Sequence, residues 1–308
     1  MTTWTENQIP DQSGRVAIVT GANSGLGWET ARALASKGAT VIIACRSIAK
    51  ANLAADQIKA LKPSGQVVVM ALDLGDLATV YAFATDFHQN YHRLDLLINN
   101  AGVVLPPYGK TVQGFEQQFG INHLGHFALT GLLLDKLTAT PNARVVAVSS
   151  SVHRSGVINF DDLNWERRNY QPMGAYGQSK LAILLFTYEL QRRLVAAGQS
   201  TLTVAADPGW AATDAQRHSS MLKRLNPIFA QPPKKGVLPT LYGATAPDVQ
   251  GGDYFGPGGL GGLYGSPKKL TSSARSHDEA VARRLWTVSE ELTYVKYTFA
   301  PAKIPTGQ

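Results

Sequence analysis

An apolar strand runs directly into a glycine-rich turn at Val16-Ala17-Ile18-Val19-Thr20-Gly21-Ala22-Asn23-Ser24-Gly25-Leu26-Gly27. A glycine turn at the start of a helix places backbone N–H groups where they hold a dinucleotide pyrophosphate. The glycines also let the backbone approach phosphate closely and let the helix pack closely on the strand. Their spacing, G-x-x-x-G-x-G, differs from the usual G-x-G-x-x-G fingerprint, so the prediction depends on the position of the turn between strand and helix. A glycine-rich turn without a ligand is the alternative.

Strand-like and helix-like segments alternate through most of the chain. Six short segments rich in Val, Ile or Leu are predicted to be strands: residues 16–20, 40–45, 66–72, 94–98, 144–149 and 201–205. Helical spacing is found between them, for example at residues 26–37, 48–62 and 176–197. Near-continuous apolar runs are typical of parallel strands covered on both faces. The alternation predicts an α/β fold, a doubly wound Rossmann-type parallel sheet with helices on both faces and a ligand site beyond the carboxyl ends of the strands.

The length of 308 residues and the absence of a linker predict a single domain. The predicted division is an N-terminal extension at residues 1–13 and one domain at 14–308, which includes a substrate-loop excursion at 208–235 and a C-terminal extension at 256–308. Proline and glycine concentrate between Pro208 and Gly265, where the regular alternation fails. Near the end, Ser276 and Glu279 resemble a capping box. An apolar stripe then predicts a last helix docked on the body through Val281, Leu285, Val288 and Leu292.

The composition fits a soluble globular protein, with 44% apolar and 17% charged residues. The net charge is +7, but the basic residues are scattered and form no run beyond pairs. A solvated basic surface is therefore expected, without a nucleic-acid partner. Cys45 is the single cysteine, which excludes an intrachain disulfide and a thiolate zinc site. The polar N-terminus and the lack of a long apolar window predict a cytoplasmic protein with no integral membrane segment.

The end of the second predicted strand indicates which nicotinamide nucleotide is bound. An acidic residue there would bond the ribose 2′-hydroxyl and repel a 2′-phosphate. The sequence Val41-Ile-Ile-Ala-Cys45-Arg46-Ser47 has no acid, and none appears until Asp56. Arg46 is placed where a guanidinium could grip the phosphate. Together these features predict NADP(H), with an exposed arginine and no ligand as the alternative.

Two further segments follow predicted strands at the same edge of the sheet. Asp73 comes after the third strand and could accept from the adenine amino group, or cap the next helix. Asn99-Asn100-Ala101-Gly102 comes after the fourth strand, where small residues would let the backbone approach a cofactor ribose. A plain turn would also explain the second segment.

Tyr176 and Lys180 are four residues apart, so they lie on one face of a predicted helix. A free tyrosine has a pKa of about 10, roughly three units above neutrality. We expect the Lys180 ammonium and an oxidised nicotinamide to lower the pKa of Tyr176. Ser150 closes the fifth strand and would donate a hydrogen bond to a substrate oxygen as negative charge develops there. An ordinary exposed Tyr–Lys pair is the alternative, because the pattern is common by chance.

The ordered set of motifs resembles the short-chain dehydrogenase/reductase family over about residues 14–215. The matching pieces are Thr20-Gly21-x-x-x-Gly25-x-Gly27, Asn99-Asn100-Ala101-Gly102, Asn122, Ser150, Tyr176-x-x-x-Lys180 and Pro208-Gly209. The resemblance implies a seven-stranded sheet whose last strand lies near residues 253–255. It also implies a catalytic tetrad of Asn122, Ser150, Tyr176 and Lys180, in which Asn122 helps to hold a water that relays protons to Lys180. The nucleotide contacts expected from motifs and resemblance together are Gly21, Asn23, Ser24, Gly25, Leu26, Gly27, Arg46, Asp73, Leu74, Asn100, Ala101, Gly102, Tyr176, Lys180, Pro208, Gly209 and Thr213.

Within the family, the chain is most similar to the retinol-dehydrogenase-like branch. The similarity lies in the strand end at Cys45-Arg46, in Asn122-His123-Leu-Gly-His126-Phe and in the 26-residue gap from Ser150 to Tyr176. That branch prefers NADP(H), in agreement with the prediction from Arg46. The membrane-anchoring N-terminus of many retinol dehydrogenases is absent, so a soluble enzyme is expected. Two residues near the site depart from those in relatives, namely Ala147 and Asp207.

Three other groups are expected to have no catalytic or metal-binding role. His123 and His126 have the H-x-x-H spacing of metal ligands, but no third ligand stands at a matching offset. The glycine-rich segment 251–265 lacks the Gly-Lys-Ser/Thr ending of a phosphate loop, so turns around an edge strand are expected there. An acidic cluster is expected in a solvated loop, without glycosidase chemistry, at Asp161, Asp162 and Glu166.

We therefore expect NADPH-dependent, reversible reduction of a bulky apolar ketone or aldehyde, with Tyr176 as general acid/base. Such a substrate suits an apolar insertion and flap, built from Phe160, Trp165, Tyr170, Trp210, Met221, Leu222, Leu225, Ile228 and Phe229; these side chains could instead simply pack the flap down. One alternative is a light-driven ring reductase similar to protochlorophyllide reductase, although that branch relies on further cysteines. Another is a protein that senses NADP(H) without turnover. Family members often form homo-oligomers through the helix at Tyr176, although the long C-terminal part could block that face.

Overall fold

The computed structural model describes residues 4–209, 231–259, 262 and 264–299. Its centre is an eight-stranded sheet with the order β3-β2-β1-β4-β5-β6-β7-β8. The strands are β1 Val16–Thr20, β2 Thr40–Cys45, β3 Gln66–Ala71, β4 Leu96–Asn99, β5 Arg144–Val148, β6 Leu202–Ala206, β7 Tyr254–Gly259 and β8 Tyr264–Lys269. The helices are η1 Glu6–Gln8, α1 Gly25–Ser36, α2 Ile48–Ala60, α3 Leu77–Asn90, α4 Gln117–Phe119, the π-turn η2 Gly120–Leu124, α5 Gly125–Leu132, α6 Leu134–Ala139, η3 Ser151–Ser155, α7 Pro172–Ala196, α9 Pro233–Gly236, α10 Leu238–Thr245, η6 Ala274–His277 and α11 Glu279–Thr293.

The sheet is doubly wound, as the sequence predicts. The chain begins at β1, winds outward to β3, and returns to the other side of β1 as β4. Strands β1 to β7 are all parallel, and β1 pairs with β4 through Val19 and Ile98. The direction of winding therefore reverses between β1 and β4, and a ligand site is expected beyond their carboxyl ends.

The glycine-rich segment adds one strand more than the sequence led us to expect. Strand β8 pairs antiparallel with β7, joining Phe255 to Lys269 and Pro257 to Pro267. The predicted seven-stranded sheet is therefore wrong by one strand. The glycines and prolines within β7 and β8 are typical of turns, and it is the pairing of the two strands that makes this part of the chain extended. Pro267 lies on the edge strand, where a missing N–H donor is tolerated.

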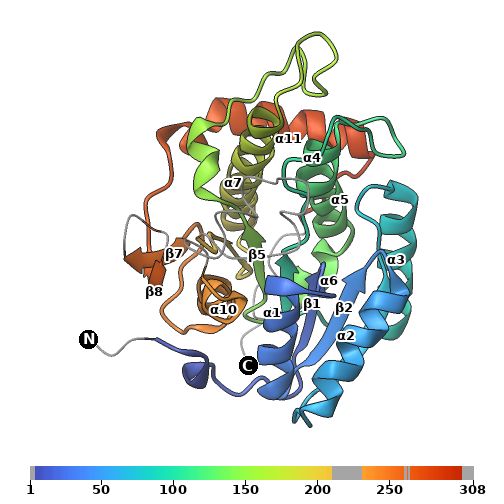
Figure 1. Ribbon diagram of the computed structural model, residues 1–308, viewed down its shortest axis with the longest axis vertical. Helices are drawn as coiled ribbons and strands as arrows, with labels where there is room; N and C mark the ends of the chain where they lie inside the picture. The colour runs from blue at the N-terminus through green and yellow to red at the C-terminus, as the bar shows by residue number, and fades with distance from the viewer. Residues whose placement is uncertain (1–3, 210–230, 260–261, 263, 300–308) are drawn as a thin grey trace, which may run out of the picture.

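Two hydrophobic layers cover the two faces of the sheet (Figure 1). Successive strand residues point to opposite faces, so Val19 and Ile43 pack on one face and Ile18 and Ile42 on the other. The first layer includes residues of α1, α2 and α10, and the second includes residues of α3, α5 and α7. Burial on both faces explains why the strands read as continuous apolar runs.

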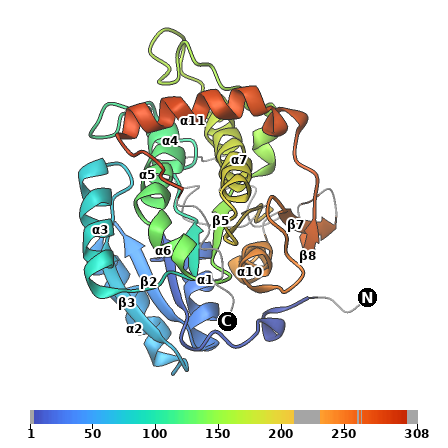
Figure 2. The same ribbon diagram turned by 180° about the vertical axis from the view of Figure 1, so that it is seen from behind.

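The last helix docks on the body, but it begins differently from the prediction. Ser276 lies in η6, and Asp278 caps α11 by accepting from the N–H of Val281 at 3.0 Å. The predicted capping box is therefore wrong. Helix α11 lies across one end of the molecule and contacts α7 and α5 (Figures 1 and 2). Of the predicted stripe, Leu285 is buried and Val281 and Leu292 are partly buried against the core. The other buried residues of the helix are Ala282, Trp286, Ser289 and Thr293.

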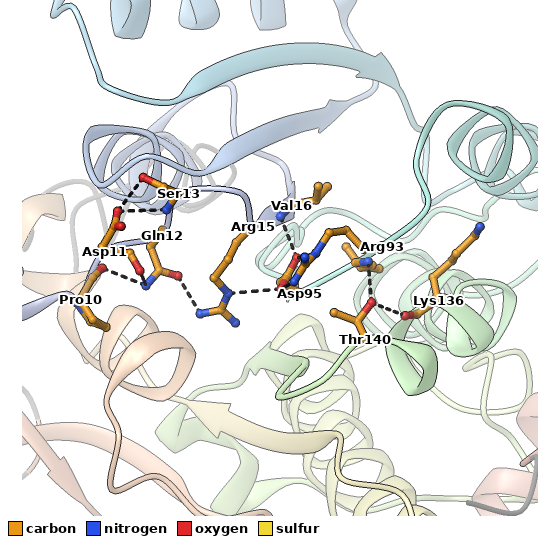
Figure 3. A network of polar contacts seen from close by, with 11 residues as sticks. Pro10, Asp11, Gln12, Ser13, Arg15, Val16, Arg93, Asp95, Lys136 and Thr140 are labelled. Atoms are coloured by element: carbon orange, nitrogen blue, oxygen red, sulfur yellow. Dashed lines mark hydrogen bonds and ion pairs between the residues drawn. The ribbon is translucent and has the colours of Figure 1, made fainter. Parts of the chain in front are cut away.

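A buried carboxylate joins the starts of two central strands at the amino end of the sheet (Figure 3). Asp95 accepts from the N–H of Val16 at 2.9 Å. Its other oxygen lies 2.7 Å from the guanidinium of Arg93 and 3.4 Å from that of Arg15. The backbone N–H of Leu94, the residue before Asp95, donates to the hydroxyl of Thr140. These bonds fix β1 against β4 and thereby support the turn at the opposite end of both strands.

Candidate active site

A cleft of about 270 Å³ opens at the carboxyl ends of β1, β2, β3 and β4. Twelve of the residues predicted to bind nucleotide line it together: Gly21, Asn23, Ser24, Gly25, Leu26, Gly27, Arg46, Asp73, Leu74, Asn100, Ala101 and Gly102. Sequence reasoning missed seven further lining residues, namely Ala44, Cys45, Ser47, Lys50, Leu72, Val103 and Ile121. Lys50 could have been found, because it lies in the first turn of the helix predicted at residues 48–62, directly after the strand end at Arg46.

The glycine turn leaves no space for side chains. Gly21 and Gly25 have positive φ angles of 67° and 57°, which favour glycine. A Cβ on Gly27 would lie 2.6 Å from the side chain of Asn100 and from the carbonyl of Gly21. Within the described chain, the Ser24 side chain makes no capping bond to α1, so the N–H groups of the first turn stay available to an anion. The turn therefore fits a dinucleotide pyrophosphate.

Two cations stand at the far end of this cleft. Arg46 follows β2, and its side chain is 67% exposed. Its Nε lies 4.0 Å from a carboxylate oxygen of Asp73, which is too far for a hydrogen bond. Lys50, in the first turn of α2, lines the same cleft. Both side chains could turn toward a phosphate at little cost.

Asp73 stays within the cleft and does not cap the next helix. One of its oxygens accepts from the N–H of Gly75 at 2.9 Å. The cap of α3 is Asp76, which accepts from the N–H of Ala78. The capping alternative for Asp73 is therefore wrong, and its second oxygen faces the weak ion pair with Arg46.

Lys180 is buried beside the end of β5. Its Nζ donates to the carbonyl of Val148 at 2.8 Å and lies 5.6 Å from the centre of the Tyr176 ring. Burial lowers the pKa of Lys180 to about 8, and the charge of Asp207 opposes that shift. The ammonium is therefore held by a backbone carbonyl near the phenol.

Tyr176 lies in the second turn of α7, because the helix begins at Pro172, before the predicted start. Burial raises the pKa of Tyr176, Asp207 raises it further, and a hydrogen bond with Ser150 acts in the opposite direction. The downward shift of this pKa that is expected from Lys180 together with an oxidised nicotinamide stays a prediction for the nucleotide-bound protein. The phenol is protonated at neutral pH and shares a hydrogen bond with the serine predicted beside it.

Asn122 lies in the π-turn before α5 and joins two parts of the site. Its Oδ1 accepts from the N–H of Val103 at 2.8 Å, and its Nδ2 donates to the carbonyl of the same residue at 3.1 Å. The Nδ2 group also donates to Ser179, whose hydroxyl donates to the carbonyl of Tyr176. Asn122 thus bonds both the loop that follows β4 and the helix that carries Tyr176 and Lys180.

Asp207 is a buried acid that follows β6, next to Ser149 and Ser150, which follow β5. Its carboxylate accepts from the N–H of Gly209 at 2.8 Å and from the hydroxyl of Tyr254 at 2.9 Å. Burial raises the pKa of Asp207. From the sequence, Asp207 could be noted only as a residue that differs from those in relatives. Its partner Tyr254 lies on β7, which is distant in sequence.

The Pro208-Gly209 turn follows directly. Gly209 has a φ of 65°, and the carbonyl of Pro208 accepts from the side chain of Gln231 at 2.8 Å. Thr213 and the predicted apolar flap residues lie outside the described residues, namely Trp210, Met221, Leu222, Leu225, Ile228 and Phe229.

The insertion between Ser150 and Tyr176 is held by contacts within it and by a contact with Glu116. The guanidinium of Arg168 lies 3.5 Å from the centre of the buried Trp165 ring. Tyr170 donates to Glu116 at 3.0 Å. Asp162 accepts from the N–H of Glu166 and is mostly buried, so the expectation of a wholly solvated acidic loop is wrong.

The two histidines of the H-x-x-H segment bond to other parts of the protein. His123 lies 2.9 Å from the hydroxyl of Ser289 on α11. His126 lies 2.9 Å from the hydroxyl of Thr20 and 3.0 Å from the carbonyl of Asn122. Burial lowers the pKa of His123 to about 3 and that of His126 to about 4. Both rings are therefore neutral at physiological pH.

No helix in the described ranges is both long enough and apolar enough to cross a membrane.

Comparison with known proteins gives consistent matches. The model of the family described as short chain dehydrogenase matches residues 15–222. The chain is 44% identical to human retinol dehydrogenase 12, over 95% of this chain and 90% of that protein. It is 43% identical to human retinol dehydrogenase 13, over 91% and 84%. The solved structure of an uncharacterised protein from Mycobacterium paratuberculosis superposes with a TM-score of 0.83 at 45% identity, covering 96% of this chain and all of that one.

Proposed function

This chain belongs to the short-chain dehydrogenase family, and we propose that it is an NADPH-dependent carbonyl reductase that also runs in reverse as an alcohol dehydrogenase. The family assignment makes it an oxidoreductase of alcohols or carbonyls that uses a nicotinamide nucleotide. The proposal adds the nucleotide preference, the proton donor and the substrate class. Its main support is the cleft, whose lining includes Arg46 and Lys50 and also Gly102, where an added Cβ would lie 3.9 Å from Nζ of Lys180.

The cleft favours a nucleotide that carries a 2′-phosphate. Arg46 and Lys50 supply positive charge after β2, where NAD-binding folds place an acid for the ribose hydroxyls. Among the described residues that line the cleft, the one carboxylate is that of Asp73, which follows β3 and pairs only weakly with Arg46. A 2′-phosphate would replace that weak contact with a charge-assisted bond.

The catalytic residues are arranged to deliver a proton. A bound nicotinamide nucleotide supplies hydride from C4 of its reduced ring. Tyr176 is protonated at neutral pH because burial raises its pKa, so it can act as the acid that protonates the carbonyl oxygen. When a substrate is bound, Ser150 would donate its single hydroxyl hydrogen to the same oxygen. Lys180 would hold its charge beside the phenol and stabilise the phenolate left behind.

The substrate class follows from similarity and from the apolar surroundings. The matched relatives are named for retinol, and we propose a bulky, apolar aldehyde, ketone or alcohol of that kind. A retinoid, a steroid-like ketone, a medium-chain ketone and an aryl ketone are all of this class. The partly buried Phe160 and Leu163 in the insertion add apolar surface close to α7.

The test is NADPH consumption across a panel of these carbonyls, with NADH as the control nucleotide. Turnover with at least one member is expected, and Tyr176→Phe should lose at least about a hundredfold in rate while still binding NADPH. Tyr188→Phe is the matched control, because it lies in the same helix and bonds Ser272 away from the cleft. Near-normal turnover by Tyr176→Phe would refute the assigned role. NADPH binding without turnover on any carbonyl would instead favour a nucleotide-sensing protein, and strict dependence on light would favour a ring reductase.

A further inference from the structure

His126 lies between the nucleotide cleft and the predicted catalytic residues. Its Nδ1 is 3.0 Å from the carbonyl oxygen of Asn122, and its Nε2 is 2.9 Å from Oγ1 of Thr20. A carbonyl only accepts hydrogen bonds, so Nδ1 carries the hydrogen in the neutral ring and Nε2 is free to accept. The Thr20 hydroxyl therefore donates to His126.

Because the Thr20 hydroxyl donates its hydrogen to His126, its oxygen is oriented to accept from the loop after β4. The same oxygen accepts from the N–H of Asn100 and from the N–H of Ala101, each at 2.9 Å. A hydroxyl has one hydrogen, and its other available acceptor is the carbonyl of Ile98 at 3.3 Å. With the hydrogen directed to His126, both lone pairs face the two amides. Rotation toward Ile98 would turn one lone pair away from them.

The other side of His126 leads to the catalytic residues. The carbonyl that it bonds belongs to Asn122, whose side chain joins the backbone of Val103 to the hydroxyl of Ser179. That hydroxyl bonds the carbonyl of Tyr176. Two sets of hydrogen bonds, joined covalently through Asn122, thus connect the end of β1 to α7, and His126 links Thr20 to Asn122.

We propose that His126 is a positioning residue that holds the loop at Asn100 and Ala101 in register with Asn122. It acts through Thr20 and through the Asn122 backbone, and it need not touch nucleotide or substrate. This proposal rests on the proposed function to the extent that the loop lines a nucleotide cleft. Burial keeps the ring neutral, since the pKa of His126 is about 4, so the arrangement persists across the neutral range.

Hydrogen exchange of the loop tests the proposal without nucleotide. His126→Leu keeps the approximate volume and removes both bonds, whereas His126→Gln can still accept with its oxygen and donate with its nitrogen. His123→Leu is the matched control, because His123 is equally buried nearby but bonds Ser289 on α11. Exchange in residues 96–103 should be at least about threefold faster in His126→Leu and unchanged in the other two. Unchanged exchange in His126→Leu would overturn the proposal.

The affinity for NADPH is a second measurement. It uses a second variant, at Thr20, so that the test still holds if one variant fails to fold. His126→Leu should weaken NADPH binding about tenfold, as expected for one lost buried hydrogen bond. Thr20→Val removes that bond and both amide contacts, so it should weaken binding at least as much. Because Thr20→Val already removes the contact through which His126 acts on the loop, the double variant should bind no more weakly than Thr20→Val alone, whereas independent effects would add a further loss of about tenfold. His126→Gln should restore binding, and His123→Leu should leave it unchanged. A double variant that binds about tenfold more weakly than Thr20→Val would overturn the proposal. A wild-type protein that binds no NADPH would refute the proposed function, while the exchange experiment still decides the role of His126.

Discussion

Arg46 provides a quantitative test of nucleotide preference. Its guanidinium lies in the cleft at the end of β2, makes only a 4.0 Å contact with Asp73, and is 67% exposed. A charge-assisted hydrogen bond is worth about 1.5–3 kcal/mol. The exposure and the neighbouring Lys50 place Arg46 at the low end of that range, because solvent and salt screen the contact. Arg46→Ala should therefore cost about 1.5 kcal/mol, which raises the Kd for NADPH about tenfold.

The Kd for NADH should stay the same, because NADH has no 2′-phosphate. Fluorescence titration of both nucleotides at one fixed salt concentration gives the ratio of the two dissociation constants, which should fall about tenfold in the variant. Arg283→Ala is the matched control, since that arginine is 58% exposed and pairs with Glu279 on α11. An equal loss of NADPH and NADH affinity in Arg46→Ala would refute the reasoning, as would a wild-type preference for NADH.

Three further predictions concern stability and pH. Asp95→Asn should lower the free energy of unfolding, measured by urea unfolding, by about 2–3 kcal/mol, because the buried carboxylate bonds Val16 and Arg93. In the control Asp135→Asn, at an exposed aspartate, the free energy of unfolding should fall by less than about 0.5 kcal/mol. His123 and His126 have pKa values lowered to about 3 and about 4, so below about pH 6.5 the unfolded state binds protons that the folded state does not. Stability should then fall with decreasing pH by up to about 1.4 kcal/mol per unit for each histidine, and His123→Gln should reduce that slope; an unchanged slope would contradict it. Burial raises the pKa of Tyr176 and lowers that of Lys180 to about 8, so carbonyl reduction should be nearly constant between about pH 6 and 7, where both groups keep their protons. Alcohol oxidation, which needs the phenolate, should increase with pH over that range. A decrease in oxidation with rising pH would count against Tyr176 as the base.

The parts of the fold that follow from local pattern were predictable. Six of the seven parallel strands read as apolar runs because helices cover both faces of the sheet. The glycine turn was recognisable because its positive φ angles and close contacts require glycine. Strand β8 was missed because its extended form depends on pairing with β7. The cap of α11 was misassigned by two residues, since Ser276 bonds Ser272 instead of the helix.

In the candidate site too, local motifs could be predicted from the sequence, whereas contacts between remote segments could not. Motif spacing placed the cleft residues, but it could not show what Lys180 bonds. Its ammonium is held by the carbonyl of Val148, and burial dominates the pKa of Tyr176. Asp207 and His126 gain their importance from Tyr254 and Thr20, which are distant in sequence. Such contacts between remote segments become visible only in the folded chain.

Hydride transfer in a single turnover tests the central claim most directly. NADPH carrying two deuterium atoms at C4 is mixed with excess enzyme and a carbonyl from the active class, and the product alcohol is analysed by mass spectrometry. The account predicts one deuterium on the carbon that bore the oxygen in the wild-type protein, and at least about a hundredfold slower incorporation in Tyr176→Phe. Alcohol formed without deuterium, or formed at the same rate by Tyr176→Phe, would contradict it.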